Sequence, residues 1–326
     1  MEMEAKTHRP LSASRDRLSW RGGFALDTWQ GFRDALRALD GVRLRRFAAF
    51  LFLLACAFCV PLAQLVAFAW RSDVYSHILL VPVISIWMIA AKHESLSVRL
   101  STAWKPAVSL AVIGAILLLL RIGWLGRTAL VGLEIRLALS TLSFVAFANA
   151  GAFLFLGAAF MRAVAFPCAF LVFLAPFPAE ALKRMEVFLQ HASADVAYTM
   201  ISMTGIPVLR EGLYFKLPGM LLEVAPECSG IRSTLVLLIT SFFAGNLLLR
   251  NPRSRAVLVL AVIPLAILRN GFRILCLAWL AVEVNPEIIH SPLHSCGGPI
   301  FFALSLIPFG LLLVILRKRD KRSPNV

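Results

Sequence analysis

Long apolar runs alternate with short polar segments along the chain, and the length of these runs is the main structural signal in the sequence. A helix that crosses a lipid bilayer needs about 20 predominantly apolar residues. The pattern therefore predicts an all-α fold, a polytopic membrane helical bundle of about eight transmembrane helices. The predicted spans are roughly 47–69, 77–91, 106–121, 137–158, 161–177, 233–249, 255–283 and 298–316. The second and third are short and leave room for extension into their flanks.

Two further segments have helical periodicity but are too polar to span a membrane. Residues 178–204 carry several charged side chains, so we predict an amphipathic helix at the outer face of the bundle. If this segment did span the bilayer, every later loop would lie on the opposite side. Residues 25–40 predict a short amphipathic helix at the cytoplasmic surface, with Trp29, Phe32 and Leu36 on one side.

The composition agrees with a membrane location. Of the 326 residues, 59% are hydrophobic and 16% are charged, and the mean hydropathy is +0.80. A soluble domain averages about 45–50% apolar residues, so this chain could not cover its apolar surface in water. The net charge of +15 does not indicate a nucleic-acid partner, because the basic residues crowd the short segments between apolar runs.

The distribution of these basic residues predicts the orientation. With eight spans both termini lie on one side, and that side receives about two thirds of the 33 Lys and Arg residues. The positive-inside rule then places both termini in the cytoplasm. We predict a basic cytoplasmic extension at 1–46, a transmembrane domain at 47–316 and a basic cytoplasmic tail at 317–326. The tail can lie against anionic lipid headgroups.

The cysteines predict neither a zinc site nor a disulfide framework, because no paired ligand spacing is present. Four of the six lie in hydrophobic stretches, where a cysteine is usually an inert packing residue. We predict no metal and no cofactor. The six are Cys56, Cys59, Cys168, Cys228, Cys276 and Cys296.

Three reactive side chains converge in the predicted topology. Cys228 lies just before the sixth span and His294 just before the eighth. Arg273 lies deep in the seventh span, roughly 27 Å from its cytoplasmic edge at about 1.5 Å per residue. All three therefore fall at one depth on the outer face. A helix is expected to start directly after Cys228, where backbone N–H groups favour a thiolate. The neighbouring Glu227 opposes this unless Arg232 or Arg273 neutralises it.

Each of these residues also has a structural explanation. Cys228 could be a packing residue or form a disulfide with Cys296 in an oxidising compartment. Arg273 could extend its side chain to the headgroups, and Arg269, one turn away, fits that explanation better. The short side chain of Asn270, on the same helix face as Arg273, does not. His294, like His290, could simply be solvated.

Together the three groups are sufficient for acyl transfer. A thiolate attacks a peptide carbonyl, an imidazole moves the proton to the leaving amine, and a guanidinium stabilises the oxyanion. The acyl-enzyme then passes to an amine or to water.

Four motifs, in order along the chain, resemble those of the exosortases and archaeosortases. Residues 225–233, Ala-Pro-Glu-Cys-Ser-Gly-Ile-Arg-Ser, resemble the cysteine motif, and Asn270 to Arg273 match an Asn-x-x-Arg element. His294 to Gly298 match the His-x-x-x-Gly element of the bacterial exosortases. Trp70 with Tyr75-Ser76-His77 resembles an early motif. The resemblance covers about 70–310, with Ile78 where many members have glycine.

The resemblance implies a membrane cysteine transpeptidase of the bacterial inner membrane, with its active site on the periplasmic face. Its expected partners are membrane lipid and exported proteins that end in a short motif such as Pro-Glu-Pro, one transmembrane helix and a basic cluster. A link to the exopolysaccharide machinery is also implied, and no nucleic acid. The resemblance maps the nucleophile to Cys228 and the paired basic groups to Arg273 and His294. The supporting or substrate-binding residues expected around them are Glu227, Ser229, Gly230, Arg232, Asn270 and His77.

Two other functions remain open from the sequence. The first is a non-catalytic membrane subunit or carrier in polysaccharide export, because intramembrane Arg and Asn often line transport pathways. The second is a hydrolytic intramembrane-type protease, which shares the acyl-enzyme and differs only in its product.

Overall fold

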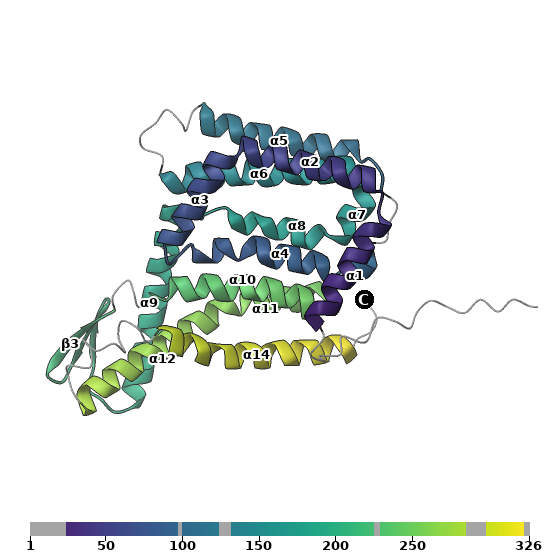
Figure 1. The fold of residues 1–326 in the computed structure, drawn as a ribbon. Coiled ribbons are helices and arrows are strands. Elements are labelled where there is room, and N and C mark those ends of the chain that lie inside the picture. Colours follow the sequence, from purple (N-terminus) through teal and green to yellow (C-terminus); the bar gives the residue numbers. More distant parts are fainter. Residues whose placement is uncertain (1–23, 97–99, 124–131, 225–228, 285–297, 323–326) are drawn as a thin grey trace, which may run out of the picture.

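The structure, a computed structural model, describes residues 24–96, 100–123, 132–224, 229–284 and 298–322. Within these ranges most long helices run side by side along a common axis (Figure 1). Many of their apolar side chains face outward, as expected when lipid rather than water surrounds a bundle. The predicted all-α polytopic membrane fold is therefore confirmed.

Each of the eight predicted spans corresponds to a helical segment. Within the described ranges, five segments are long and apolar enough to cross a bilayer on their own, and two bent pairs pass the same test together. The remaining segment, η1 (Ser76–Leu79) with α4 (Val81–Ala90), is shorter. The five are α5 (Trp104–Ile122), α6 (Leu133–Phe155), α10 (Ile231–Leu248), α11 (Pro252–Leu260) with α12 (Val262–Glu283), and α14 (Gly298–Arg322).

The two bent pairs break just before a proline. Helices α2 (Gly41–Ala57) and α3 (Cys59–Arg71) meet at 72°, and α7 (Gly157–Ala163) meets α8 (Ala165–Phe170) with η3 (Leu171–Leu174) at 76°. Pro61 and Pro167 are each the third residue of the second helix. Proline has no N–H and its ring clashes with the carbonyl four residues earlier, so the helix cannot continue straight through it.

Helices α9 (Ala179–Met203) and α1 (Phe24–Ala38) lie at opposite ends of the bundle, across the axes of the spans (Figure 1). Both predicted amphipathic helices therefore form. Helix α9 buries Leu182, Leu189 and Ile201, and its charged residues lie on the other face. Helix α1 packs against the cluster that contains η2 (His93–Leu96) and α7. The end of α14 lies at the same end of the bundle as α1 (Figure 1).

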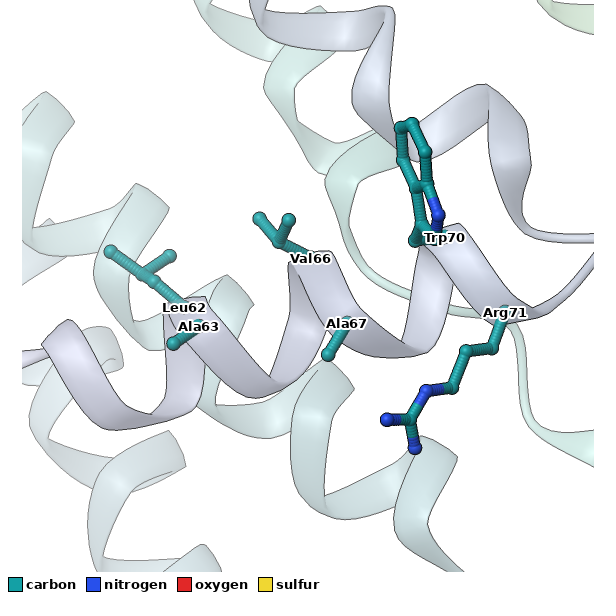
Figure 2. A pocket seen from close by; sticks show the side chains of 6 residues that line it. All are labelled: Leu62, Ala63, Val66, Ala67, Trp70 and Arg71. Atoms are coloured by element: carbon teal, nitrogen blue, oxygen red, sulfur yellow. The ribbon is translucent and has the colours of Figure 1, made fainter.

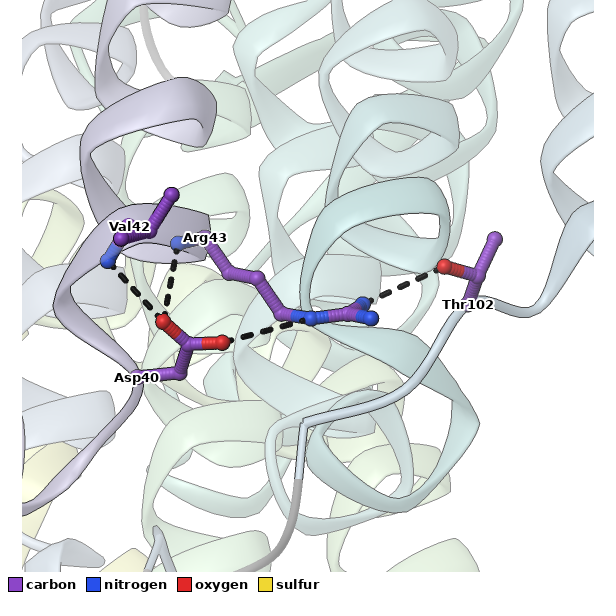
Figure 3. Close-up of polar contacts among 4 residues, drawn as sticks. All are labelled: Asp40, Val42, Arg43 and Thr102. Carbon is purple, nitrogen blue, oxygen red and sulfur yellow. Dashed lines mark hydrogen bonds and ion pairs between the residues drawn. The ribbon is translucent and has the colours of Figure 1, made fainter.

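The start of α2 is fixed by an N-cap. Asp40 accepts hydrogen bonds from the backbone N–H groups of Val42 and Arg43, at 3.0 and 3.4 Å. Its other oxygen lies 3.5 Å from Arg43 Nε, and Arg43 Nη1 donates to Thr102 Oγ1 at 3.2 Å (Figure 3). These contacts satisfy N–H groups that a helix start leaves open and connect α2 to the segment before α5.

A small antiparallel sheet, which the sequence did not predict, projects beyond α9 (Figure 1). Its strands are β1 (Leu209–Glu211), β2 (Tyr214–Leu217) and β3 (Met220–Glu223), in the order β1-β2-β3. Turns at Gly212 and Gly219, with φ of 65° and 76°, connect them. The strands bury one face, with Phe215 fully covered, against α9 and α12. The sheet thus connects α9 to the segment before α10.

Helices α9 and α12 approach each other closely at a glycine. A Cβ atom at Gly271 would lie 2.7 Å from Val196 Cγ1, closer than real side chains pack. Glycine at this position lets the two backbones come together, and the contact fixes which face of α12 points inward. That face carries Arg269, Asn270 and Arg273.

Candidate functional site

The candidate site is built around the start of α10. Cys228 and Glu227 lie outside the described residues, but Ser229 and Gly230 follow them directly in the sequence. Ser229 is fully buried, and Gly230 adopts φ +66° as the N-cap of α10. This left-handed conformation is unfavourable for residues with a Cβ atom. The helix predicted directly after Cys228 is present and begins at Ile231, three residues later.

Two side chains of α12 hold this helix start by its backbone. Asn270 Nδ2 donates a hydrogen bond to the carbonyl oxygen of Ser229. Arg269 Nη2 donates to the carbonyl oxygen of Gly230 at 3.2 Å. The same guanidinium holds Asn270 in place, because Arg269 Nε and Nη2 lie 3.3 and 3.2 Å from Asn270 Oδ1. A point on α12 is thereby attached to the two residues that follow Cys228.

Arg269 and Arg273 both point into the protein, with 7% of each residue exposed, and Asn270 is 1% exposed. The interpretation of Arg269 as a side chain that extends to the headgroups is therefore wrong, and Arg273 does not fit it either. Helix α12 turns Leu268 and Phe272 outward instead. The reason is the contact of α12 with α9, which directs the polar face of the helix toward α10.

The start of α14 lies beside α12 at the level of Arg273. The rings of Phe272 and Phe301 meet edge to face, with their centroids 6.3 Å apart. Phe301 is in the first turn of α14, which begins at Gly298. His294 lies outside the described residues, as do His290 and Cys296. What the structure describes is the position of the helix that follows them.

The early Tyr-Ser-His segment packs against the start of α10. Tyr75 and Ile78 share an apolar cluster with Leu182 of α9 and Leu235 of α10. The Tyr75 hydroxyl donates to the carbonyl oxygen of Phe177 at 2.8 Å. Burial raises the pKa of the Tyr75 phenol to about 12, and the Glu134 carboxylate adds to the shift. This segment and the cysteine motif, far apart in the sequence, are thus neighbours.

His77 and Arg232 have structural contacts of their own. His77 is 5% exposed, and its Nδ1 lies 3.0 Å from the carbonyl oxygen of Val74. Arg232 Nη2 lies 2.5 Å from Asp73 Oδ2, on the surface. Arg232 therefore binds a carboxylate other than that of Glu227, and this ion pair connects the first turn of α10 to the segment after α3.

A shallow, largely apolar pocket lies along α3. Leu62, Val66 and Trp70 project from one side of the helix, and Ala63, Ala67 and Arg71 from the other (Figure 2). Its lining is almost entirely apolar, as expected of a surface that faces lipid. It offers no group that could act as a nucleophile or a base.

Sequence reasoning gave the right elements but missed two contributors to the site, Arg269 and Asp73. Arg269 could have been found from its spacing, because it lies one turn before Arg273 and beside Asn270 on a single helix face. Asp73 belongs to an exposed polar segment, and nothing in its sequence position indicates a partner 159 residues away.

The fold and these contacts define a class: a multi-pass membrane protein in which one helix carries two buried arginines and an asparagine, and holds the start of α10 through Arg269 and Asn270. The family model of transmembrane exosortases matches residues 69–311, and the chain belongs to this family. The match includes the early Tyr-Ser-His segment, the cysteine motif, the Asn-x-x-Arg element and the start of α14. No curated protein and no solved structure matches the chain.

Proposed function

We propose that this exosortase is a membrane cysteine transpeptidase that cleaves C-terminal sorting signals of exported proteins and transfers them to a carrier. One observation carries the proposal. Asn270 and Arg269 hold the backbone of Ser229 and Gly230, directly after Cys228, and Arg273 lies one turn further along the same helix. Holding the backbone beside a nucleophile fixes its position relative to a cationic group, as acyl transfer requires.

The chemistry assigned to these residues is as follows. The Cys228 thiolate attacks the scissile carbonyl carbon, and the negative charge that develops on the oxygen is stabilised by Arg273. The C–N bond then breaks, His294 gives its proton to the departing amine, and a thioester remains on Cys228. An amine of the acceptor attacks this thioester and loses its proton to His294, the C–S bond breaks, and the Cys228 thiolate is restored. Water in place of the amine gives hydrolysis.

The remaining residues have supporting roles in this proposal. Ser229, Gly230 and Asn270 hold the nucleophile segment, Arg232 and His77 support its outer edge, and Glu227 tunes the charge beside the thiol.

The proposal includes a topology, in which the site faces the periplasm and both termini lie in the cytoplasm of the bacterial cell. The chain divides into the extension 1–46, the transmembrane domain 47–316 and the tail 317–326. Substrates carry a motif, one helix and a basic cluster, and the activity accompanies exopolysaccharide production.

A co-expressed reporter tests the proposal. The reporter ends in a Pro-Glu-Pro motif, a transmembrane helix and a basic cluster, and cleavage is followed by its change in mass. Cys228→Ala is expected to leave the reporter uncleaved while it inserts at the normal level. Cys56→Ala, at an exposed position of α2, is the matched control and should cleave normally. Full cleavage by Cys228→Ala would end the proposal.

The alternative, a carrier in polysaccharide export, is favoured by the two arginines buried in one membrane helix. An impermeant thiol reagent separates the two functions. Rapid labelling of Cys228 near neutral pH supports a thiolate nucleophile on the outer face, whereas labelling only at alkaline pH favours the carrier. Mass analysis of the reporter product distinguishes transfer from hydrolysis.

A further inference from the structure

Arg269 has an unused hydrogen-bonding edge inside the candidate site. Its Nε and Nη2 are committed to Asn270 Oδ1 and to the Gly230 carbonyl oxygen. Its Nη1 is buried and has no hydrogen-bond partner among the described residues. A guanidinium that is fixed on one side and carries an unpaired N–H group on the other is a preorganised donor, because its orientation no longer has to be acquired when a ligand binds.

The charge of Arg269 is also unmatched within the described part of the chain. The described ion pairs include no carboxylate at Arg269. The charged side chain one helical turn away is Arg273, which has the same sign and is equally buried. A buried cation without an anion is strongly disfavoured, and the usual solution is a carboxylate that binds it through charge-assisted hydrogen bonds.

From this we propose that Arg269 binds an acidic side chain of the peptide substrate, within one or two residues of the scissile bond, and so determines specificity. The inference rests on the proposed function. The distance follows from the chain itself: Gly230 is two residues after Cys228, so their Cα atoms are at most about 7.6 Å apart. An extended peptide covers about 3.3–3.6 Å per residue, so a carboxylate held at Arg269 belongs to a residue next to the bond that Cys228 attacks.

Glu227 is the internal carboxylate that could take this place instead. It directly precedes Cys228 and lies outside the described residues. An internal pair would make Arg269 a structural residue that is insensitive to the substrate. If Arg269 binds the substrate, its effect on the cleavage rate depends on the side chain in the substrate motif. If Arg269 binds Glu227, its effect is the same for every substrate.

The test uses full-length protein and two reporters that differ only in the motif, Pro-Glu-Pro or Pro-Gln-Pro. For the glutamate reporter, Arg269→Gln is expected to lower the cleavage rate about tenfold or more, the usual effect of losing a charge-assisted hydrogen bond. For the glutamine reporter the same substitution is expected to lower the rate clearly less, because only the hydrogen bonds of Arg269 to Gly230 and Asn270 are lost and no carboxylate contact. Arg269→Lys keeps the charge and should retain part of the preference for glutamate.

Two controls accompany these variants. Arg184→Gln removes an exposed arginine of α9, paired with Glu180 at 2.9 Å, and should leave the preference of the enzyme unchanged. Activity of Arg269→Gln on the glutamine reporter shows that the variant is folded. If the variant is inactive on both reporters, Arg269→Lys decides, because it can still donate to the Gly230 carbonyl.

An equal partial loss on both reporters, or no loss on either, would overturn the proposal, as would an Arg269→Lys variant that shows no preference for glutamate. It would also be overturned if Glu227→Gln removed the effect of Arg269→Gln regardless of reporter, since the partner would then be internal. Failure of the proposed function looks different, because Cys228→Ala would then cleave normally. As a readout without cleavage, Cys228→Ala is used to co-purify each reporter. Arg269→Gln in that background should reduce recovery of the glutamate reporter alone.

Discussion

The helix start at Gly230 provides the sharpest test of the site geometry. A Cβ atom there would meet Arg269 Nη2 and would lie 2.5 and 2.8 Å from Asn270 Oδ1 and Nδ2. Gly230→Ala therefore adds two unfavourable terms. The left-handed backbone costs an alanine about 1–2 kcal/mol. Moving Arg269 and Asn270 aside also loses their hydrogen bonds to the backbone carbonyls of Gly230 and Ser229, worth about 2–4 kcal/mol together.

The matched control is Gly219→Ala in the turn between β2 and β3. Gly219 has φ +76°, but a Cβ atom there meets nothing within 4 Å. It isolates the backbone term, so Gly219→Ala should cost about 1–2 kcal/mol and Gly230→Ala about 3–6 kcal/mol. The assay is the thermal midpoint of each purified variant in detergent, read as loss of the monodisperse chromatographic peak. Equal shifts for the two variants would refute the contacts described around Gly230.

Three other predictions concern other contacts of the structure. Asp320 accepts hydrogen bonds from Arg250 N, Asn251 N and Ser254 Oγ, so Asp320→Ala should lower the thermal midpoint clearly and Ser254→Ala less; an unchanged Asp320→Ala variant would contradict this. The raised pKa of Tyr75, about 12, favours the neutral phenol in the folded state. The stability that the neutral Tyr75 phenol contributes is fully present below the unfolded pKa of about 10 and is lost as pH rises toward 12. When the absorbance of the phenolates is followed as pH rises, the step at the highest pH should therefore be missing in Tyr75→Phe. Asp73→Ala should reproduce any cleavage defect of Arg232→Ala, and a double-mutant cycle should give about 0.2–1 kcal/mol, as for exposed ion pairs. A defect in only one of the two single variants would show that Arg232 has another partner.

The helices of this protein could be predicted from the sequence because the signals that produce them are local. Apolar length identified every span, and charge on one face identified α9. The apolar run that follows Cys228 identified α10. The bends in α2–α3 and α7–α8 were not predicted, although Pro61 and Pro167 carry the reason for them. The runs were counted by length, and length alone does not reveal a break.

The sheet and the role of Arg269 could not be predicted, for two different reasons. Strands of three or four residues have too few alternating positions to stand out from a loop, and β1 to β3 gain their stability by packing against α9 and α12. The inward direction of Arg269 depends on the rotation of α12 about its own axis. That rotation is set by the close contact between Gly271 and Val196, which helical periodicity does not contain.

The shortness of one helical segment has a consequence for the lipid around it. Four residues of η1 and ten of α4 span about 23 Å, against about 30 Å for the hydrocarbon core. Leu80, Val83 and Ile86 are exposed, so this segment touches lipid along its length. A segment this short favours local thinning of the bilayer beside it, which brings the headgroups closer to its ends. Since η1 packs against α10 near its start, this thinner region of the bilayer lies beside the candidate site.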